Sequence, residues 1–345
     1  MATIRRYERA MTNANQQSTS GSRHRGRKFR PRRLKTSLPR PQTELPATPQ
    51  KDAERIAKVM ARAGLCSRRE AEAWIAAGRV AVNGAVITSP ALNVTAQDRV
   101  SVDGRPLPTR ERTRLFLYHK PRGLLTTSAD PQGRPTIFGA LPKDLPRLIS
   151  VGRLDLNTEG LLLLTNDGGL ARTLELPATG WLRRYRVRAH GKVTQPDLDQ
   201  LRHGITVNGI RYGAIEAALD PYAAKGANVW LTFAMREGKN REVKNVLDAL
   251  GLQVNRLIRV SYGPFQLGDL PEGEVAEIST RTLRDQLGER IATAASADFS
   301  APLKNPLPPV EEKDGRPAPP PDLSQRGKDQ NKPRHGFSRH RKRER

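Results

Sequence analysis

Apolar residues near the start of the chain follow a helical and then an alternating pattern. They recur every three or four residues over positions 56 to 63, and Gly64 is placed to end that helix. Ser67 and Glu70 have the spacing of a capping box at the start of a second amphipathic helix. The stretch "RVAVNGAVI" then alternates around an Asn-Gly turn, a strong hairpin signal. The pattern predicts two helices followed by a β-hairpin.

Beyond residue 114 the pattern changes to short apolar segments of strand length between glycines and prolines. The four leucines at 161–164 have the length and the flanking turn residues of a fully buried strand. Further strand-like segments are "LFLYHKP", "LLTT", "RRYRVRAH", "GITVNG", "NVWLTFAM" and "RLIRVSYG". Helical patterns are fewer, chiefly "GGLARTLE" and "REVKNVLDALG". We predict an α+β fold, in which a small first domain precedes a mixed, mostly antiparallel sheet with flanking helices.

Positive charge is concentrated at the two ends of the chain. The 345 residues carry a formal net charge of +25, which is typical of a protein with a polyanionic partner. Residues 1–50 hold 12 Lys and Arg against 2 Asp and Glu, and residues 304–345 hold 12 against 6. Both ends are rich in Pro, Gln, Ser and Arg, a composition that cannot offset the entropy of chain ordering. We predict disordered basic tails at 1–50 and 286–345, domains at 51–101 and 115–285, and a linker at 102–114.

Several kinds of site are not indicated by the sequence. The single cysteine, Cys66, excludes an intramolecular disulfide, and the six histidines are too scattered to suggest a metal site. No apolar run reaches the roughly 18 residues of a membrane span, and neither a Walker loop nor a dinucleotide fingerprint occurs. We expect a monomeric, cytoplasmic protein with no metal, no cofactor and no membrane contact.

Two arginines begin the second predicted helix. Arg68 and Arg69 lie in its first turn, where the helix dipole disfavours a cation by about 0.3–1 kcal/mol. A phosphate at this end would reverse the sign, and Lys58, Arg62 and Arg79 would extend such an anion site. The alternative is an ordinary solvated basic face, and the spacing alone does not decide between the two.

One carboxylate, Asp155, stands just ahead of the leucine run. It lies between Arg153 and a turn formed by residues 158 to 160, so the buried strand anchors it to the middle of a domain. Desolvation disfavours an ionised carboxylate unless a cation or several hydrogen bonds compensate. Asp155 is therefore expected to be paired or functional.

Two other segments carry candidate residues for nucleic-acid binding. In "RRYRVRAH", period two places Arg184, Arg186 and Arg188 on one face and Tyr185 on the other. Tyr185 is either a core residue or a platform that stacks on a base, and its position alone does not decide. In "REGKNREVKNVLDALG", Lys244 near the helix start either reaches a cleft or is solvated. The same segment supplies Lys239, Asn240 and Arg241 for phosphates.

Residues 52 to 98 closely resemble the small S-four-type (α-L) RNA-binding module. The segment that carries the resemblance is "AKVMARAGLCSRREAEAWIAAGRVAVNGAVI". In that family the paired helices and the following hairpin present basic residues to folded RNA. The resemblance implies RNA-binding roles for Arg68, Arg69, Lys58 and Arg79.

The remainder, to about residue 285, resembles the rRNA pseudouridine synthases that join such a module to a catalytic domain. The segments are, in order, "HKPRGLLTT", "GRLDLNTEGLLLLTNDGGLA", "RRYRV" and "EGKNREVKNVLDALGLQVNRLIRVSYGPFQLGDLPEGE". The resemblance implies that Asp155 is the catalytic aspartate, that Tyr185 packs against the target base and that Lys244 is the basic partner of Asp155. Arginine is more frequent than lysine at that last position, so a bidentate pairing becomes a single-point contact here. Arg153 is expected to bind the substrate, and Lys239 and Arg241 the RNA.

The implied reaction is an isomerisation of uridine in ribosomal RNA. The N1–C1′ bond breaks, the base turns and C5 joins C1′, without a cofactor. Asp155 would attack C1′, add to C6 or abstract a ribose proton, and the sequence does not choose among these. The "NREVKN" helix is more similar to the branch that acts on large-subunit rRNA than to the small-subunit branch, which stays an alternative.

Two other functions compete with this interpretation. A glycosidic hydrolase would need a second carboxylate, for which Glu159 is the near candidate. A non-catalytic RNA-binding assembly factor would keep the fold, with Asp155 merely bridging Arg153.

Overall fold

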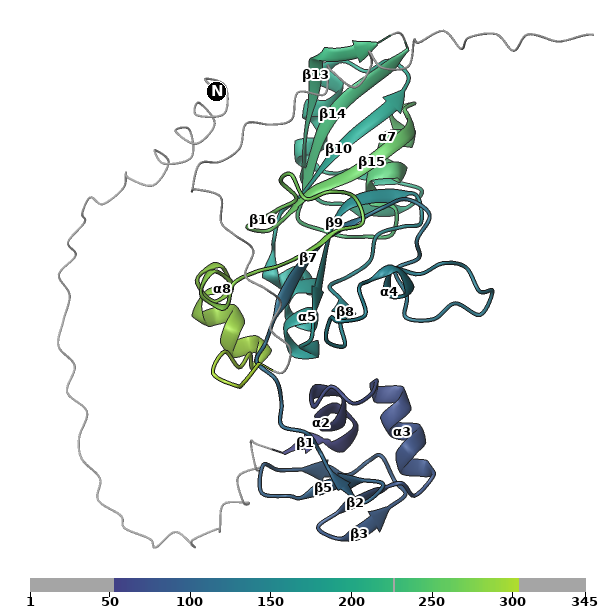
Figure 1. Ribbon diagram of the computed structural model, residues 1–345. Coiled ribbons are helices and arrows are strands. Elements are labelled where there is room, and N and C mark those ends of the chain that lie inside the picture. Colours follow the sequence, from purple (N-terminus) through teal and green to yellow (C-terminus); the bar gives the residue numbers. More distant parts are fainter. Residues whose placement is uncertain (1–52, 226, 304–345) are drawn as a thin grey trace, which may run out of the picture. The chain divides into compact units, whose positions relative to one another are not determined.

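The computed structural model describes residues 53–225 and 227–303, which form a smaller and a larger domain (Figure 1). The predicted disorder of residues 1–50 and 304–345 concerns segments outside the described residues. The predicted fold class is confirmed, because a small helical and β domain precedes a mixed, mostly antiparallel sheet with flanking helices.

The smaller domain contains the two predicted helices, α2 (Ile56–Arg62) and α3 (Arg68–Ala76). The predicted capping box begins α3. The Ser67 hydroxyl accepts a hydrogen bond from the Glu70 backbone N–H at 3.1 Å, and the Glu70 carboxylate accepts one from the Ser67 N–H at 2.6 Å. The apolar faces of both helices enclose one small core with the strands that follow.

A four-stranded antiparallel sheet completes the described part of this domain. Its strands, in spatial order, are β3 (Ala85–Ile87), β2 (Val80–Val82), β5 (Val100–Val102) and β6 (Arg105–Pro106). A second pair joins β1 (Glu54–Arg55) to β4 (Asn93–Val94). Asn83 and Gly84 both have positive φ, as the predicted hairpin turn requires. Since β5 and β6 extend beyond residue 101, the first part of the predicted linker belongs to this sheet.

Nine of the described strands form the sheet of the larger domain. They are β7 (Leu115–Lys120), β8 (Ile149–Ser150), β9 (Thr158–Thr165), β10 (Arg183–His190), β13 (Ile215–Lys225), β14 (Asn228–Met235), β15 (Gln253–Tyr262), β16 (Phe265–Gln266) and β17 (Val275–Glu277). The spatial order is β13-β14-β10-β15-β9-β7-β17, with β16 beside β15 and β8 beside β9. The pair β15 and β9 is parallel, and the other pairs described in this sheet are antiparallel.

The leucine run is buried on both faces of β9, as its pattern predicts. Leu161 and Leu163 pack with α5 (Gly168–Glu175), while Leu162 and Leu164 pack on the other side with residues of α4 (Ile137–Ala140). Two covered faces explain why the strand reads as a continuous apolar run. The predicted "LLTT" strand does not form, since Leu125 makes only an isolated bridge to Thr136 in the described chain.

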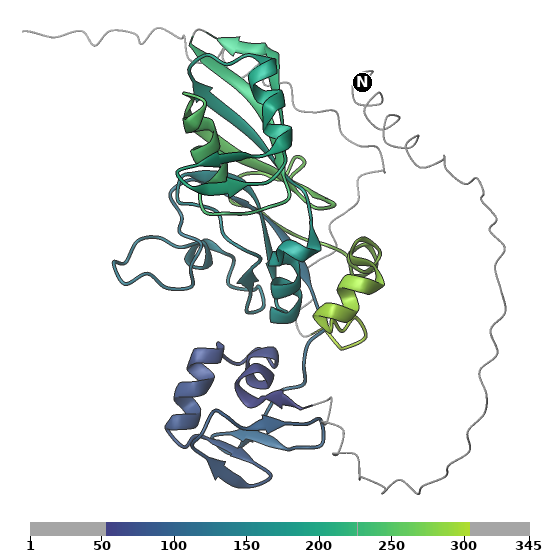
Figure 2. The same ribbon diagram turned by 180° about the vertical axis from the view of Figure 1, so that it is seen from behind.

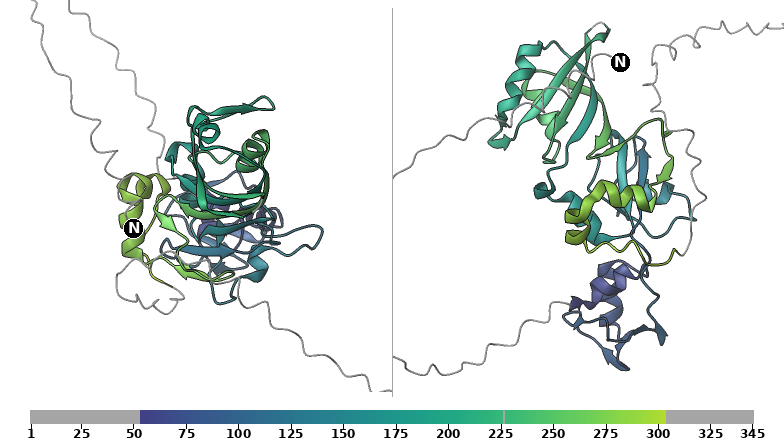
Figure 3. Two further views of the ribbon diagram at one scale, coloured as in Figure 1. Left: turned by 90° about the horizontal axis from the view of Figure 1, so that it is seen from above. Right: turned by 90° about the vertical axis from the view of Figure 1, so that its left-hand side faces the viewer.

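Short helices cover one face of the strands β13, β14, β10 and β15. Figures 2 and 3 show α6 (Gln195–Asp199) and α7 (Glu242–Ala249) on the same side of these strands. Val187 and Leu257 of the sheet pack there with Leu247 of α7. The larger domain also contains the 3-10 helices η1 (Pro177–Thr179) and η2 (Gln200–His203) and the hairpin of β11 (Ile205–Val207) and β12 (Ile210–Tyr212).

The last helix that the structure describes, α8 (Thr280–Ala295), extends past the predicted domain end at residue 285. Leu283, Leu287 and Ile291 are buried in the same core as α5. The backbone at Gly288 is not helical and kinks α8, which interrupts the apolar pattern in the sequence. The interpretation of 286–345 as a tail is therefore corrected for residues 286–303, which belong to the folded domain.

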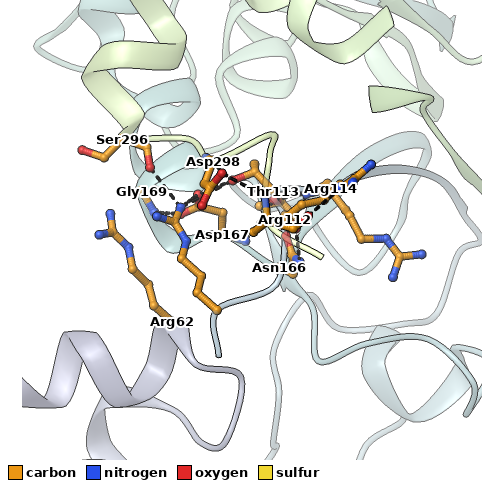
Figure 4. A network of polar contacts seen from close by, with 12 residues as sticks. Arg62, Arg112, Thr113, Arg114, Asn166, Asp167, Gly169, Ser296 and Asp298 are labelled. Carbon is orange, nitrogen blue, oxygen red and sulfur yellow. Dashed lines mark hydrogen bonds and ion pairs between the residues drawn. The ribbon is translucent and has the colours of Figure 1, made fainter. Parts of the chain in front are cut away.

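A buried polar network anchors the residues just before β7 (Figure 4). The Asp167 carboxylate accepts hydrogen bonds from Arg110 Nη2 at 2.7 Å and from the Thr113 hydroxyl at 2.8 Å. Arg110 also donates to the Ser296 carbonyl, and the Thr113 hydroxyl accepts from the Asp298 N–H. Because Thr113 and Asp167 are buried, the end of the predicted linker at 102–114 is part of the larger domain rather than exposed.

Candidate active site

A cavity of about 690 Å³ lies among the loop before β9, the end of α5, the start of α7 and the central strands. It brings together residues that are far apart in the sequence. Its lining includes six of the candidate residues: Arg153, Asp155, Tyr185, Lys239, Arg241 and Lys244. Its volume is in the range of small-molecule sites and is sufficient for a nucleotide.

Asp155 and Lys244 face each other in this cavity. Lys244 Nζ lies 3.7 Å from Asp155 Oδ2, and the side chains are 19% and 39% exposed. The distance is that of an ion pair without a hydrogen bond, so the carboxylate oxygens stay available to a ligand. Arg153 is exposed on the cavity lining, and no ion pair joins it to Asp155 in the described chain.

Lys120 fixes the loop that carries Asp155. This lysine ends β7 and is fully buried. Its ammonium group donates to the backbone carbonyls of Asp155 at 3.2 Å, Thr158 at 3.0 Å and Pro121 at 3.0 Å. These bonds hold the backbone of Asp155 and do not involve its carboxylate. Lys120 thus positions the loop through its backbone.

Two other side chains also form hydrogen bonds to the backbone of this loop. The Thr126 hydroxyl donates to the Leu154 carbonyl at 2.7 Å. The Glu175 carboxylate, at the end of α5, accepts from the Gly152 N–H at 2.7 Å. The backbone around Asp155 is therefore anchored at three points, which restricts the positions its carboxylate adopts.

The burial of Lys120 has a measurable consequence. Burial lowers its pKa to about 8 from an ordinary value of 10.5, although Asp155 and Glu159 act in the opposite direction. The unfolded chain therefore binds more protons than the folded one between these pH values, and stability rises with pH across that window. We expect this rise to be absent in Lys120→Met.

Urea unfolding of the wild type and of Lys120→Met between pH 7 and pH 10.5 measures this difference. Lys143→Met is the matched control, because Lys143 is exposed and has no ion-pair partner among residues 53–225 and 227–303. The same pH dependence in all three proteins would contradict the assignment.

Tyr185 lies on β10 with its side chain toward the cavity. It is 6% exposed, and Arg259 of β15 is its direct cross-strand neighbour. The predicted alternation of β10 is confirmed, because Tyr185, Val187 and Ala189 are buried whereas the two arginines between them are half-buried.

Two arginines beside Tyr185 are buried and were not among the predicted site residues. The guanidinium groups of Arg183 and Arg259 lie 4.6 Å and 5.0 Å from the ring centre of Tyr262. Arg183 also donates to the Tyr262 hydroxyl at 2.8 Å and to the Arg236 carbonyl at 2.5 Å. Both arginines line the cavity and make its wall electropositive.

The other predicted RNA-binding residues differ in their availability. Arg68 and Arg69 are exposed at the start of α3, with no ion-pair partner in the described chain. Lys58 pairs with Glu54 at 2.5 Å.

Of the remaining predicted RNA-binding residues, Arg79 and Lys239 pair with acidic neighbours and Arg241 is exposed. Arg79 forms two hydrogen bonds to Asp103, of 2.6 Å and 3.0 Å. Lys239 pairs with Glu237 at 2.6 Å, whereas Arg241 is exposed and has a left-handed backbone with φ of 50°.

Comparison with known proteins identifies both domains. Residues 54–100 match the S4 domain, and residues 114–249 match the RNA pseudouridylate synthase family. An uncharacterized RNA pseudouridine synthase of Rickettsia prowazekii is 44% identical over 235 residues, which are 68% of this chain and 97% of that protein. The chain belongs to the RNA pseudouridylate synthase family.

Two named relatives are similar to this RNA pseudouridine synthase over most of the described chain. Ribosomal large subunit pseudouridine synthase B of Pseudomonas aeruginosa is 41% identical over 246 residues, covering 69% of this chain and 62% of that protein. Its namesake from Haemophilus influenzae is 38% identical over 268 residues, covering 75% and 74%. The predicted family and the predicted enzyme class, an isomerase, are confirmed.

The position of Glu159 argues separately against a hydrolase mechanism in this synthase. Glu159 is 4% exposed and pairs with Arg256 at 2.7 Å and with Arg122 at 3.7 Å. It is absent from the cavity lining, so this candidate for the second carboxylate of a hydrolase is committed to the two arginines.

None of the helices that the structure describes is long and apolar enough to cross a membrane.

Proposed function

We propose that the synthase converts a uridine of large-subunit ribosomal RNA to pseudouridine in the cavity around Asp155. The observation that carries the assignment is the 3.7 Å contact between Asp155 and Lys244 in a cavity that Tyr185 also lines. The names of the Pseudomonas and Haemophilus relatives support large-subunit rRNA as the substrate. A small-subunit substrate is the alternative.

Asp155 is assigned as the catalytic carboxylate. The anchored loop holds it at the cavity wall, and the Lys244 ammonium lies 3.7 Å from its carboxylate, where the opposite charges attract each other. An ionised carboxylate acts on the ribose or the base while the N1–C1′ bond breaks and C5 bonds to C1′. Atoms and charge are conserved overall, since the proton lost from C5 is replaced by one gained at N1.

The other cavity residues are assigned to binding. Tyr185 supports the flipped base, and Arg153, exposed on the cavity lining, binds the RNA backbone near the target. Lys239 and Arg241 extend the electropositive surface from the start of α7. Arg68 and Arg69 of the S4 domain supply a second, phosphate-directed contact. The cytoplasmic location, the monomeric state and the absence of a cofactor stay predictions.

Tritium release tests the substrate. Uridine labelled at C5 loses its tritium when C5 bonds to C1′, so transcripts of large-subunit and small-subunit rRNA are incubated separately with the protein. We expect release from the large-subunit transcript, with no free uracil and no chain cleavage. Release from the small-subunit transcript alone would overturn the substrate assignment.

The role of Tyr185 is tested by two substitutions. Tyr185→Ala is expected to slow isomerisation about 10- to 100-fold, because base stacking on an aromatic ring contributes about 1–3 kcal/mol. Tyr185→Phe keeps the ring, and the Tyr185 hydroxyl has no hydrogen-bond partner in the described chain, so this variant should retain most of the activity. Equal activity of both variants and the wild type in single-turnover assays would contradict the stacking role.

A further inference from the structure

Arg259 is a buried cation without a counter-ion. It is 3% exposed, and no carboxylate pairs with it in the part of the chain that the structure describes. Its Nε donates to the Leu161 carbonyl at 2.7 Å, while its Nη2 is shut off from solvent and lacks a partner. The Leu161 carbonyl and the Tyr262 ring, 5.0 Å away, offset this charge only in part. Because a buried charge costs several kcal/mol, a merely structural arginine would be expected to have an acidic partner as well.

Arg183 differs, although it is equally close to the cavity. Its Nη1 donates to backbone carbonyls and its Nη2 to the Tyr262 hydroxyl, so its polar groups have acceptors. Arg183 therefore holds the turn before α7 in place. Arg259 has no comparable set of acceptors, and its charge is left for a ligand.

Arg259 lies beside the position that the base of the substrate would occupy. It is the cross-strand neighbour of Tyr185, and both line the cavity. Its backbone also faces Gly160 in the parallel pairing of β9 and β15. Gly160 has φ of 100°, and a β-carbon there would collide with the Arg259 backbone, so the strand after Asp155 is packed tightly against Arg259.

The chemistry of the reaction supplies the missing negative charge. When the N1–C1′ bond breaks, the bonding electron pair stays on N1, and conjugation spreads it to O2 and O4 of uracil. In the covalent route a carboxylate oxygen of Asp155 bonds to C1′ at the same time, so the negative charge passes from Asp155 to the base. It returns when C5 bonds to C1′, the carboxylate leaves with its pair, C5 loses its proton and N1 gains one.

We propose that the Arg259 guanidinium donates a hydrogen bond to a carbonyl oxygen of the detached uracil and stabilises its negative charge while the base turns. The inference rests on the proposed function and adds a catalytic residue to it. Lys244 would contact the carboxylate of Asp155 before cleavage, and Arg259 would contact the charged base after it. A preorganised cation at the site of developing charge typically contributes 10²- to 10³-fold to the rate.

The test compares Arg259→Gln, Arg259→Lys and Arg259→Ala in single-turnover assays on tritiated large-subunit rRNA. For Arg259→Gln we expect a rate at saturating protein about 100-fold below the wild type, with RNA affinity within about threefold. Arg259→Lys should recover at least about tenfold of that loss, and ethylguanidinium should accelerate Arg259→Ala but not the wild type. A purely structural role would give neither recovery.

Arg284→Gln is the control, because Arg284 is exposed on α8, lies outside the cavity and has no ion-pair partner in the described chain. It should retain the wild-type rate. The proposal is overturned if Arg259→Gln turns over like the wild type, or if neither lysine nor ethylguanidinium restores the lost rate. Tritium release by the wild type separates the substrate assignment from the role of Arg259. If the wild type releases no tritium from large-subunit rRNA, the substrate assignment fails. The Arg259 variants are then compared on the rRNA that the wild type does modify.

Discussion

Replacing Asp155 by asparagine is expected to lower the single-turnover rate of isomerisation by at least about 1000-fold. The amide has nearly the same shape as the carboxylate but carries no charge and cannot act as a nucleophile or a base. The loop itself should persist, because Lys120 holds it through backbone carbonyls and not through the Asp155 side chain. RNA affinity should therefore change little. Tritium release under single-turnover conditions, with filter binding for affinity, measures both quantities.

Asp144→Asn is the control for this substitution. Asp144 is an exposed carboxylate of the same domain and is absent from the cavity lining. It should leave both the rate and the affinity unchanged. If Asp155→Asn kept more than about a tenth of the wild-type rate, the carboxylate would not perform the chemistry.

Replacing Lys244 by methionine is expected to reduce the rate about 100-fold. The substitution keeps most of the apolar side chain but removes the ammonium group 3.7 Å from Asp155. The carboxylate then loses its favourable electrostatic contact within the cavity. Because Lys244 is partly buried on α7, its aliphatic part also packs there, and methionine limits the loss of stability to the charge itself.

Lys244→Arg separates charge from packing. A guanidinium group retains the positive charge and forms a bidentate contact with a carboxylate more readily than an ammonium group does. We expect Lys244→Arg to match or exceed the wild-type rate. Thermal unfolding provides the structural control for both variants. A Lys244→Arg protein as slow as Lys244→Met, at equal thermal stability, would refute the ion-pair role.

Local patterns in the sequence predicted much of the fold. The Ser67 capping box, the alternation of β10 and the apolar face of α7 each depend on neighbouring residues, and the structure contains all three. The leucine run was also sufficient to place Asp155 directly ahead of a buried strand. These features follow from the periods of helices and strands, which a single sequence displays.

Residues that support the site were missed because their partners are distant in sequence. Lys120 bonds to carbonyls about 35 residues later, and Arg259 meets Leu161 across 98 residues. The sequence did contain a signal for Lys120, because it follows Phe116 and Tyr118 at every second position of β7 and so lies on their buried face. Arg183 likewise shares the phase of Tyr185 in β10. A charged residue in the buried phase of a strand indicates a functional or structural role.

The domain boundaries were predicted less well for a different reason. The composition of residues 102–114 is that of an exposed linker, but its last residues meet the end of α8 through the network around Asp167. The boundary at residue 285 was missed because the kink at Gly288 interrupts the apolar pattern of α8. Composition reports average exposure, whereas these segments are held by a few specific polar and apolar contacts.

Mapping pseudouridines in ribosomal RNA tests the central claim most directly. RNA is compared from cells with the wild-type chain, from cells without it, and from cells that carry Asp155→Asn in its place. The account predicts a large-subunit pseudouridine that disappears without the chain and returns with the wild type but not with Asp155→Asn. A large-subunit map that is identical in all three, or full modification by Asp155→Asn, would contradict it.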